Sequence, residues 1–216
     1  MATVSPIQSE SRTVLYGVPW RTYVELRDNP DNDHLHMTYD RGTLEIMAPS
    51  AAHGRFGSFI AMTIMAWSEE LEIPICCLED MTCKREDVEK GFEPDKCFYV
   101  QNEPRMWQKL EVDLTVDPPP DLAIEIEISR SAIQKVASIY AAFGVPEVWR
   151  FDGNRLQAYE LIEGGYQPRE SSLCFPGLPL QKVEELARQV GQVRELTLIR
   201  GFRRWVRETY SAGTDL

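Results

Sequence analysis

The sequence predicts a mixed α/β domain, in which a β-sheet is flanked by helices and a β-hairpin and C-terminal helices are appended. Residues 121–128 alternate strictly between Leu or Ile and Asp, Ala or Glu, which is the pattern of a β-strand. Residues 131–143 have the pattern of a helix and come directly after this strand, so the strand is expected inside an α/β sheet. A long amphipathic helix over residues 50–71 precedes both and is expected to pack on the sheet.

The elements before the acidic strand follow from local turn and capping signals. Residues 36–39 and 43–47 alternate around the turn residues Asp40-Arg41-Gly42, which predicts a hairpin. Ser50 is placed to cap the long helix. The remaining expected elements are a helix at 20–27, strands at 75–78, 81–84 and 94–100, a charged loop at 84–91, and a long insertion at 101–120 that ends in three prolines.

After the acidic strand, glycines mark the ends of the elements. Gly144 is a natural C-terminal residue for the helix at 131–143. The segment 180–210 is expected to be helical, with a break near Gly191. Further strands are expected at 147–151, at 156–162 and from 166 onward. We therefore expect a flexible N-terminus over residues 1–15, a main domain over 16–178 and a C-terminal helical extension over 179–216.

Composition limits the classes of function. The formal net charge of −11 argues against strong non-specific binding to nucleic acid, although one local basic surface remains compatible with it. No apolar run approaches the roughly 20 residues that a membrane helix needs, and the polar N-terminus lacks a signal-peptide core, so a cytoplasmic protein is expected. The five cysteines form no CxxC pair and are expected to be reduced. The three histidines are too few and scattered to predict a histidine-rich metal site.

Two carboxylates could meet if their strands are neighbours. Asp95 follows Pro94 at the start of one predicted strand, and Glu125 lies in the middle of the acidic strand. Two carboxylates with a backbone carbonyl and waters suit Mg²⁺, which takes oxygen ligands and supports phosphodiester hydrolysis. Lys135 lies at the border of the apolar face of the next helix, from which its ammonium group could reach the acidic strand.

The order of these residues resembles the Uma-type family of restriction endonucleases, within the PD-(D/E)XK nuclease superfamily. The resemblance covers about residues 20–161. It rests on Pro94-Asp95, Asp121-Leu-Ala-Ile-Glu-Ile-Glu-Ile-Ser129, Lys135, Tyr140 and Gly144-Val-Pro-Glu-Val-Trp149, together with Gly42-Thr-Leu-Glu-Ile-Met47 and His53. It implies a restriction-endonuclease-like fold, hydrolysis of DNA phosphodiester bonds with Mg²⁺ (or Mn²⁺), and a homodimer.

The resemblance also implies roles in a metal site for individual residues of this sequence. Asp95 matches the proline-aspartate metal ligand and Glu125 the acidic ligand of the second motif, with the Ile126 carbonyl assisting. Glu127 stands where the superfamily usually has lysine, so either Lys135 takes over the lysine role or the site is impaired. Glu127 would then join a second metal or hydrogen-bond Lys135.

Two auxiliary residues complete the expected set. Glu45 in the hairpin and His53 at the helix start would be auxiliary members of the site. The plainer interpretations stay open at both positions, because Glu45 also fits an exposed strand residue and His53 a hydrogen-bonded helix-start histidine.

Other functions remain open on the sequence. Glu125 and Glu127 also fit the solvent face of an edge strand, and an impaired site would leave a binding or assembly module. A third alternative is an enzyme that uses Glu125 and Glu127 as an acid–base pair on a small substrate. Four arginines form one helical stripe that could contact DNA phosphates, or could be a solvated or dimer-facing surface: Arg200, Arg203, Arg204 and Arg207.

Overall fold

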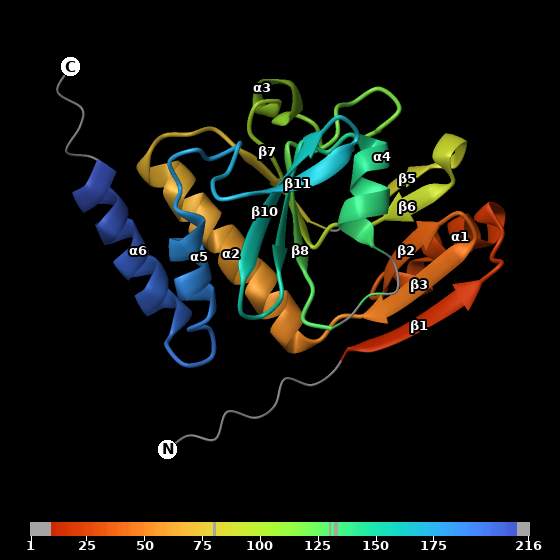
Figure 1. Ribbon diagram of the computed structural model, residues 1–216, viewed down its shortest axis with the longest axis horizontal. Coiled ribbons are helices and arrows are strands. Elements are labelled where there is room, and N and C mark those ends of the chain that lie inside the picture. The colour runs from red at the N-terminus through yellow and green to blue at the C-terminus, as the bar shows by residue number, and fades with distance from the viewer. Residues whose placement is uncertain (1–9, 80, 130, 132–133, 211–216) are drawn as a thin grey trace.

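The structure is a computed structural model, and it describes residues 10–79, 81–129, 131 and 134–210. Two β-sheets lie beside each other, and helices pack on their faces (Figure 1). The mixed α/β class expected from the sequence is confirmed, although the strands divide between two sheets rather than forming one. Within the described residues, no helix has both the length and the apolar character that crossing a membrane requires.

The six-stranded sheet contains the acidic strand in its interior. Its strands, in spatial order, are β11 (Gly165–Arg169), β10 (Leu156–Ile162), β9 (Glu147–Phe151), β8 (Leu122–Ile126), β7 (Lys96–Tyr99) and β4 (Cys76–Leu78). β8 pairs with β7 on one side and β9 on the other, and the β8–β9 pair is parallel whereas the other pairs are antiparallel. A parallel pair needs a crossover connection, and the helical segment between β8 and β9 supplies it.

The five-stranded sheet contains the predicted hairpin. Its strands, in spatial order, are β1 (Ser11–Tyr16), β3 (Thr43–Ala48), β2 (His36–Asp40), β6 (Lys90–Phe92) and β5 (Cys83–Arg85). The hairpin of β2 and β3 turns at Arg41 and Gly42, both with positive φ, as the sequence predicts.

Two expectations near this sheet need correction. Residues 11–15, expected in a flexible N-terminus, belong to β1, and β1 pairs along the whole of β3; residues 1–9 lie outside the described residues. The expected charged loop at 84–91 contains the end of β5, the short helix η2 (Glu86–Val88) and the start of β6. Backbone pairing explains the difference, because β6 bonds to both β2 and β5, and three-residue strands leave little periodicity in a sequence.

The helices begin and end close to the predicted positions. Ser50 caps α2 by accepting a hydrogen bond from the His53 amide at 3.2 Å, as expected. The helices outside the β8–β9 connection are α1 (Trp20–Arg27), η1 (Pro30–Asn32), α2 (Ala51–Glu70), α3 (Glu103–Met106), α5 (Leu180–Ala187) and α6 (Glu195–Tyr210). The predicted insertion at 101–120 thus contains the single helical turn α3, and Gly191 has positive φ in the break between α5 and α6.

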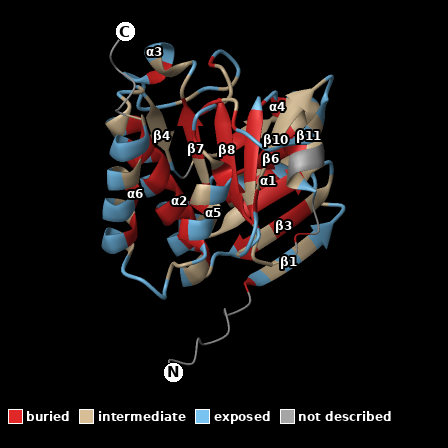
Figure 2. Ribbon diagram, turned by 60° about the vertical axis from the view of Figure 1, so that its left-hand side comes forward, coloured by how far each residue is buried: buried red, intermediate tan, exposed pale blue. Residues whose placement is uncertain are grey.

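A single large core joins α2, the six-stranded sheet and the C-terminal helices. It includes Phe59 and Ile60 of α2, Ile124 of β8, and Phe202 and Val206 of α6, all at most 1% exposed. The buried residues concentrate on α2 and the central strands, whereas the outer side of α6 is exposed (Figure 2). α5 and α6 therefore share a core with the main body.

The alternation predicted for β8 separates two cores. Leu122, Ile124 and Ile126 face the large core with α2, whereas Ala123 belongs to a second cluster that contains Tyr140 and Phe143. Side chains on a strand point alternately to opposite faces, so Glu125 lies on the same side as Ala123. The carboxylate therefore faces the helical connection between β8 and β9.

That helical connection starts later than the sequence predicts. It consists of the π-helix η3 (Lys135–Tyr140) and the α-helical turn α4 (Ala141–Phe143), which ends at Gly144 with φ +72°. The predicted start at Ser131 is wrong, because Ser131 is not helical and instead donates a hydrogen bond to Glu45 at 2.8 Å. Residues 132 and 133 of the predicted segment lie outside the described residues.

Candidate active site

The sheet register brings Asp95 and Glu125 together. β7 and β8 are antiparallel with Lys96 opposite Ile124, so Asp95 comes opposite Glu125 one residue further along. Directly opposed residues of an antiparallel pair have neighbouring side chains. Both residues are buried, with 9% of Asp95 and 5% of Glu125 exposed. The strand adjacency on which the predicted site depended is therefore present.

Glu125 is held by one ammonium group and one hydroxyl group. Lys135 Nζ donates to Glu125 Oε2 at 2.8 Å, and the Tyr140 hydroxyl donates to Glu125 Oε1. Burial raises the pKa of Glu125 and outweighs the lowering effect of the Lys135 charge. Burial lowers the pKa of Lys135. The charges of Glu125 and Asp95 raise this pKa by more than burial lowers it, so the net shift is upward and Lys135 stays an ammonium group.

Asp95 uses its two oxygens differently. Oδ2 accepts a hydrogen bond from the Ile126 amide at 2.6 Å, so the contact of Ile126 with Asp95 runs through its N–H group. Oδ1 lies 2.8 Å from His53 Nε2 and 3.3 Å from His36 Nδ1. Burial raises the pKa of Asp95, but the two histidines and Lys135 outweigh it and hold the pKa well below its usual range.

A polar network connects His53 to the five-stranded sheet. His53 Nδ1 contacts Glu10, whose carboxylate also accepts from Arg12 at 3.0 Å. Arg12 in turn donates to Glu45 at 2.6 Å. Of the two expected auxiliary residues, His53 thus touches Asp95, whereas Glu45 contacts Arg12 and Ser131.

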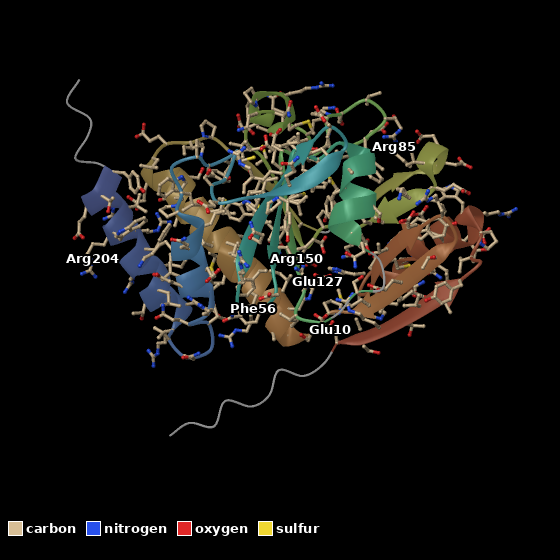
Figure 3. All side chains as sticks on the ribbon, viewed as in Figure 1. Glu10, Phe56, Arg85, Glu127, Arg150 and Arg204 are labelled. Atoms are coloured by element: carbon tan, nitrogen blue, oxygen red, sulfur yellow. The ribbon has the colours of Figure 1, made fainter. Side chains whose placement is uncertain are left out.

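Glu127 lies outside this cluster. Its side chain is 26% exposed and accepts from Arg150 Nε, and Figure 3 shows the two residues close together near the centre of the molecule. Lys135 contacts Glu125, so the alternative in which Glu127 bonds Lys135 is not the observed pairing. Glu125 and Glu127 each have their own cation, which does not favour an acid–base pair on a small substrate.

A cavity opens beside Glu125 and Lys135. It has a volume of about 680 Å³ and is lined by both of these residues, by Gln134 and Arg150, and by the aromatic side chains of Tyr159 and Tyr166. Cavities of this size accommodate small ligands or one part of a larger one. The buried ion pair therefore has access to a polar and aromatic cleft.

The predicted arginine stripe lies elsewhere. Arg203 pairs with Glu69 and Glu70 of α2. Arg207 donates to Glu70 from two of its nitrogens, at 2.7 and 2.9 Å. Arg200 and Arg204 are exposed on α6, and Figure 3 shows Arg204 at the edge of the molecule, away from Glu127 and Arg150. Half of the stripe is thus neutralised by α2.

Sequence reasoning missed some residues around Asp95. No sequence pattern singles out His36 or predicts a histidine-rich metal site, yet His36 and His53 converge on Asp95. Glu10 and Arg12 were placed in the flexible N-terminus. The sequence contains one signal for this contact. His36 begins the hairpin and His53 comes just after the helix cap, and β3 joins these two elements directly, so the two histidines can lie close together.

Comparison with known proteins gives one family match. The model of the family Uma2, described as "Putative restriction endonuclease", matches residues 20–208. No curated protein matches the chain. Among solved structures, the chain is similar to a protein from Anabaena variabilis described as "a putative nuclease belonging to DUF820", with 13% sequence identity, 77% of this chain and 90% of that chain covered, and a TM-score of 0.38.

Proposed function

This chain belongs to the Uma2 family, and we propose that it hydrolyses phosphodiester bonds of DNA with a divalent metal ion, Mg²⁺ or Mn²⁺. The observation that carries the proposal is the arrangement of two buried carboxylates, Asp95 just before β7 and Glu125 of β8, with Lys135 of η3 bonded to Glu125. An ammonium group paired with carboxylates beside an open cleft is suited to phosphate chemistry.

The residues present fit a divalent cation. Asp95 Oδ1 is buried and makes no hydrogen bond of normal geometry, so it retains a lone pair for an ion. We propose that Asp95 and Glu125 hold the ion and that the Ile126 carbonyl assists. The bound ion would neutralise the negative charge of the phosphate and lower the pKa of water.

The side chains around the ion have separate tasks in this proposal. Lys135 orients the attacking water or stabilises the charge that develops on the phosphate. Tyr140 fixes the orientation of Glu125 through its hydroxyl group. Lys135 reaches Glu125 although Glu127 replaces the usual lysine, so this replacement does not remove the ammonium group from the site. This observation favours an active nuclease over the alternative of a binding or assembly module.

Access for DNA is proposed through the cleft of about 680 Å³. Gln134 and Arg150 provide polar contacts there, and Tyr159 and Tyr166 provide ring faces on which a base can stack. The exposed Arg200 and Arg204 remain proposed phosphate contacts at a distance from this cleft. If Arg200→Gln and Arg204→Gln together leave DNA affinity and its salt dependence unchanged, this part of the proposal fails.

A homodimer and a cytoplasmic location complete the proposal. Cleavage of both strands of a duplex is commonly shared between two copies of a nuclease domain. Sedimentation of the purified chain with and without duplex DNA measures the oligomeric state. The five cysteines are free, in keeping with a reducing compartment.

Cleavage of supercoiled plasmid tests the activity. We expect nicked and linear products with Mg²⁺ or Mn²⁺ and none with a chelator. Asp95→Ala and Glu125→Ala should each abolish cleavage, whereas Asp87→Ala, which removes an exposed carboxylate, should retain it. Absence of cleavage by the parent protein with either metal would instead favour the binding module.

A further inference from the structure

We infer that the cleft of about 680 Å³ binds one unpaired nucleotide of DNA. Arg150 contacts the phosphate of this nucleotide, and Tyr159 and Tyr166 stack on its base. The inference rests on the proposed cleavage of DNA and adds the class of substrate, which is single-stranded DNA or DNA with an unpaired nucleotide beside the bond that is cut. A base inside a duplex is stacked and paired, so it enters such a cavity only after it has left the duplex.

The register of the six-stranded sheet places the three cleft residues in one row. On β9, Arg150 lies two residues after Val148, and Val148 lies opposite Tyr159 of β10. Tyr166 of β11 lies opposite Leu161, which is two residues after Tyr159. Residues two apart on a strand share a face, as do directly opposed residues, so Arg150, Tyr159 and Tyr166 all point to the cleft side of the sheet. With strands about 4.8 Å apart, the row has a cation at one end and a ring about 10 Å away at the other.

Arg150 is held in place but keeps donors for a phosphate. Glu127 accepts a hydrogen bond from Arg150 Nε, which is one of the five N–H donors of a guanidinium group. Burial lowers the pKa of Arg150, but hydrogen bonds to Glu127 and Tyr159 raise this pKa by more, so the group stays charged. The side chain is 39% exposed, and its remaining donors suit the oxygens of a phosphate. Glu127 is therefore a positioning residue for Arg150.

The two tyrosines provide fixed, partly open rings. The Tyr166 hydroxyl group donates to the Val145 carbonyl, which fixes the orientation of the half-buried ring. Tyr159 is also half-buried and lies beside Arg150. Stacking of a base on such a ring is tolerant of sequence, because every base has a π-face. The amide of Gln134, which also lines the cleft, can donate to or accept from the edge of the base.

The size and charge of the cleft favour one nucleotide over a duplex. Cavities of this volume hold molecules of the size of a drug, a class that includes a single nucleotide. The two cations of the cleft, Lys135 and Arg150, are each paired with a glutamate, and the whole chain has a formal net charge of −11. Attraction to the phosphates of a duplex is therefore weak, whereas stacking on an unpaired base does not depend on net charge.

Fluorescence anisotropy with a labelled DNA oligonucleotide of mixed sequence tests the inference. The oligonucleotide is used alone and annealed to its complement, with EDTA present so that no strand is cut. We expect the full chain to bind the single strand at least about 10-fold more tightly than the duplex. Equal affinity for the two forms, or tighter binding of an RNA of the same sequence, would overturn the inference.

Variants of the row separate stacking from charge. Tyr159→Leu should weaken binding of the single strand by about 5- to 150-fold, the contribution of one stacked base, whereas Tyr159→Phe keeps the ring and should bind close to the parent. Arg150→Gln should weaken binding and reduce the slope of log affinity against log salt concentration by about 0.7, the value for one phosphate of a single strand. Tyr159→Leu and Tyr159→Phe binding equally well would contradict the stacking.

Two matched controls lie outside the cleft. Tyr16→Leu changes an exposed tyrosine of β1, and Arg21→Gln changes an arginine of α1 that is paired with Glu25 at the surface. Both variants should bind the single strand as the parent does. A loss in Tyr16→Leu equal to that in Tyr159→Leu would place the binding outside the cleft and overturn the inference.

The same measurements distinguish this inference from the proposed nuclease. Cleavage of duplex plasmid together with equal binding of single strand and duplex would overturn the inference and leave the nuclease standing. A single-strand preference that depends on the Tyr159 ring, without cleavage by the parent in Mg²⁺ or Mn²⁺, would support the nucleotide site and remove the nuclease.

Discussion

Replacing Lys135 with Met tests whether the ion pair with Glu125 is held in the interior. Met keeps most of the aliphatic stem of lysine but removes the ammonium group. The Glu125 carboxylate would then remain buried, with the Tyr140 hydroxyl as its remaining partner among the contacts described.

The size of the effect depends on burial. Lys135 Nζ lies 2.8 Å from Glu125 Oε2, and the two side chains are only 10% and 6% exposed. The gross attraction at this distance is about 6 kcal/mol for an effective dielectric constant of about 20. Removing one partner of a buried pair costs about 3–5 kcal/mol, whereas exposed pairs contribute about 0–1 kcal/mol. We therefore expect Lys135→Met to lower the free energy of unfolding by about 3–5 kcal/mol.

Urea denaturation without metal, followed by circular dichroism, measures this change. The double variant Lys135→Met with Glu125→Gln carries no buried charge in the pair, so it should lose less than the sum of the two single variants, by about 1–3 kcal/mol. Lys182→Met is the matched control, because Lys182 and Glu185 form an exposed pair at 3.3 Å, and it should change stability by less than about 1 kcal/mol. A loss below about 1 kcal/mol for Lys135→Met, with additive variants, would refute the buried pair.

Two other predictions concern close packing and an interhelical ion pair. Gly91→Ala would place a Cβ atom 2.1 Å from the hydroxyl oxygen of the fully buried Tyr23, so we expect the free energy of unfolding to fall by about 1–3 kcal/mol and calorimetry to show a lower Tm. Gly54→Ala is the control, because a Cβ atom there would meet nothing within 4 Å. Equal Tm values for the two variants would contradict the clash. Hydrogen bonding from Arg207 lowers the pKa of Glu70 from 4.5 to about 2, so this pair stabilises the fold above pH 4.5 and its contribution is lost as the pH falls toward 2. The exposure of Arg207 limits the contribution of this pair to less than about 1 kcal/mol. The Tm of Arg207→Gln should be below that of the parent at neutral pH and should approach it near pH 2. A Tm difference that stays constant across this pH range would refute the role of the pair.

Several elements could be predicted because their signals are local. The alternation in β8 correctly assigned Ile124 to one face and Glu125 to the other, since successive residues of a strand must point in opposite directions. Ser50 as a helix cap and Gly144 as a helix end were also correct, since each depends on the backbone within one turn.

The pairing of strands that lie far apart in the sequence was not predicted. The strands β4, β5 and β6 have only three residues each, too few for a period to identify their partners, so the division into two sheets was not predicted. The start of the helix at Lys135 was missed because Ser131 bonds Glu45 of another sheet, which no local pattern indicates.

The residue types available for chemistry can be read from the chain alone: an aspartate after proline, an acidic strand, and a lysine on the helix that follows. Tertiary structure alone decided their partners, since it brought His36 and His53 to Asp95 and placed Lys135 against Glu125 rather than Glu127. The physical reason is that secondary structure follows from interactions between near neighbours in the chain. The partners of a buried charge are instead those groups that the packing of sheets and helices leaves within about 3 Å of it.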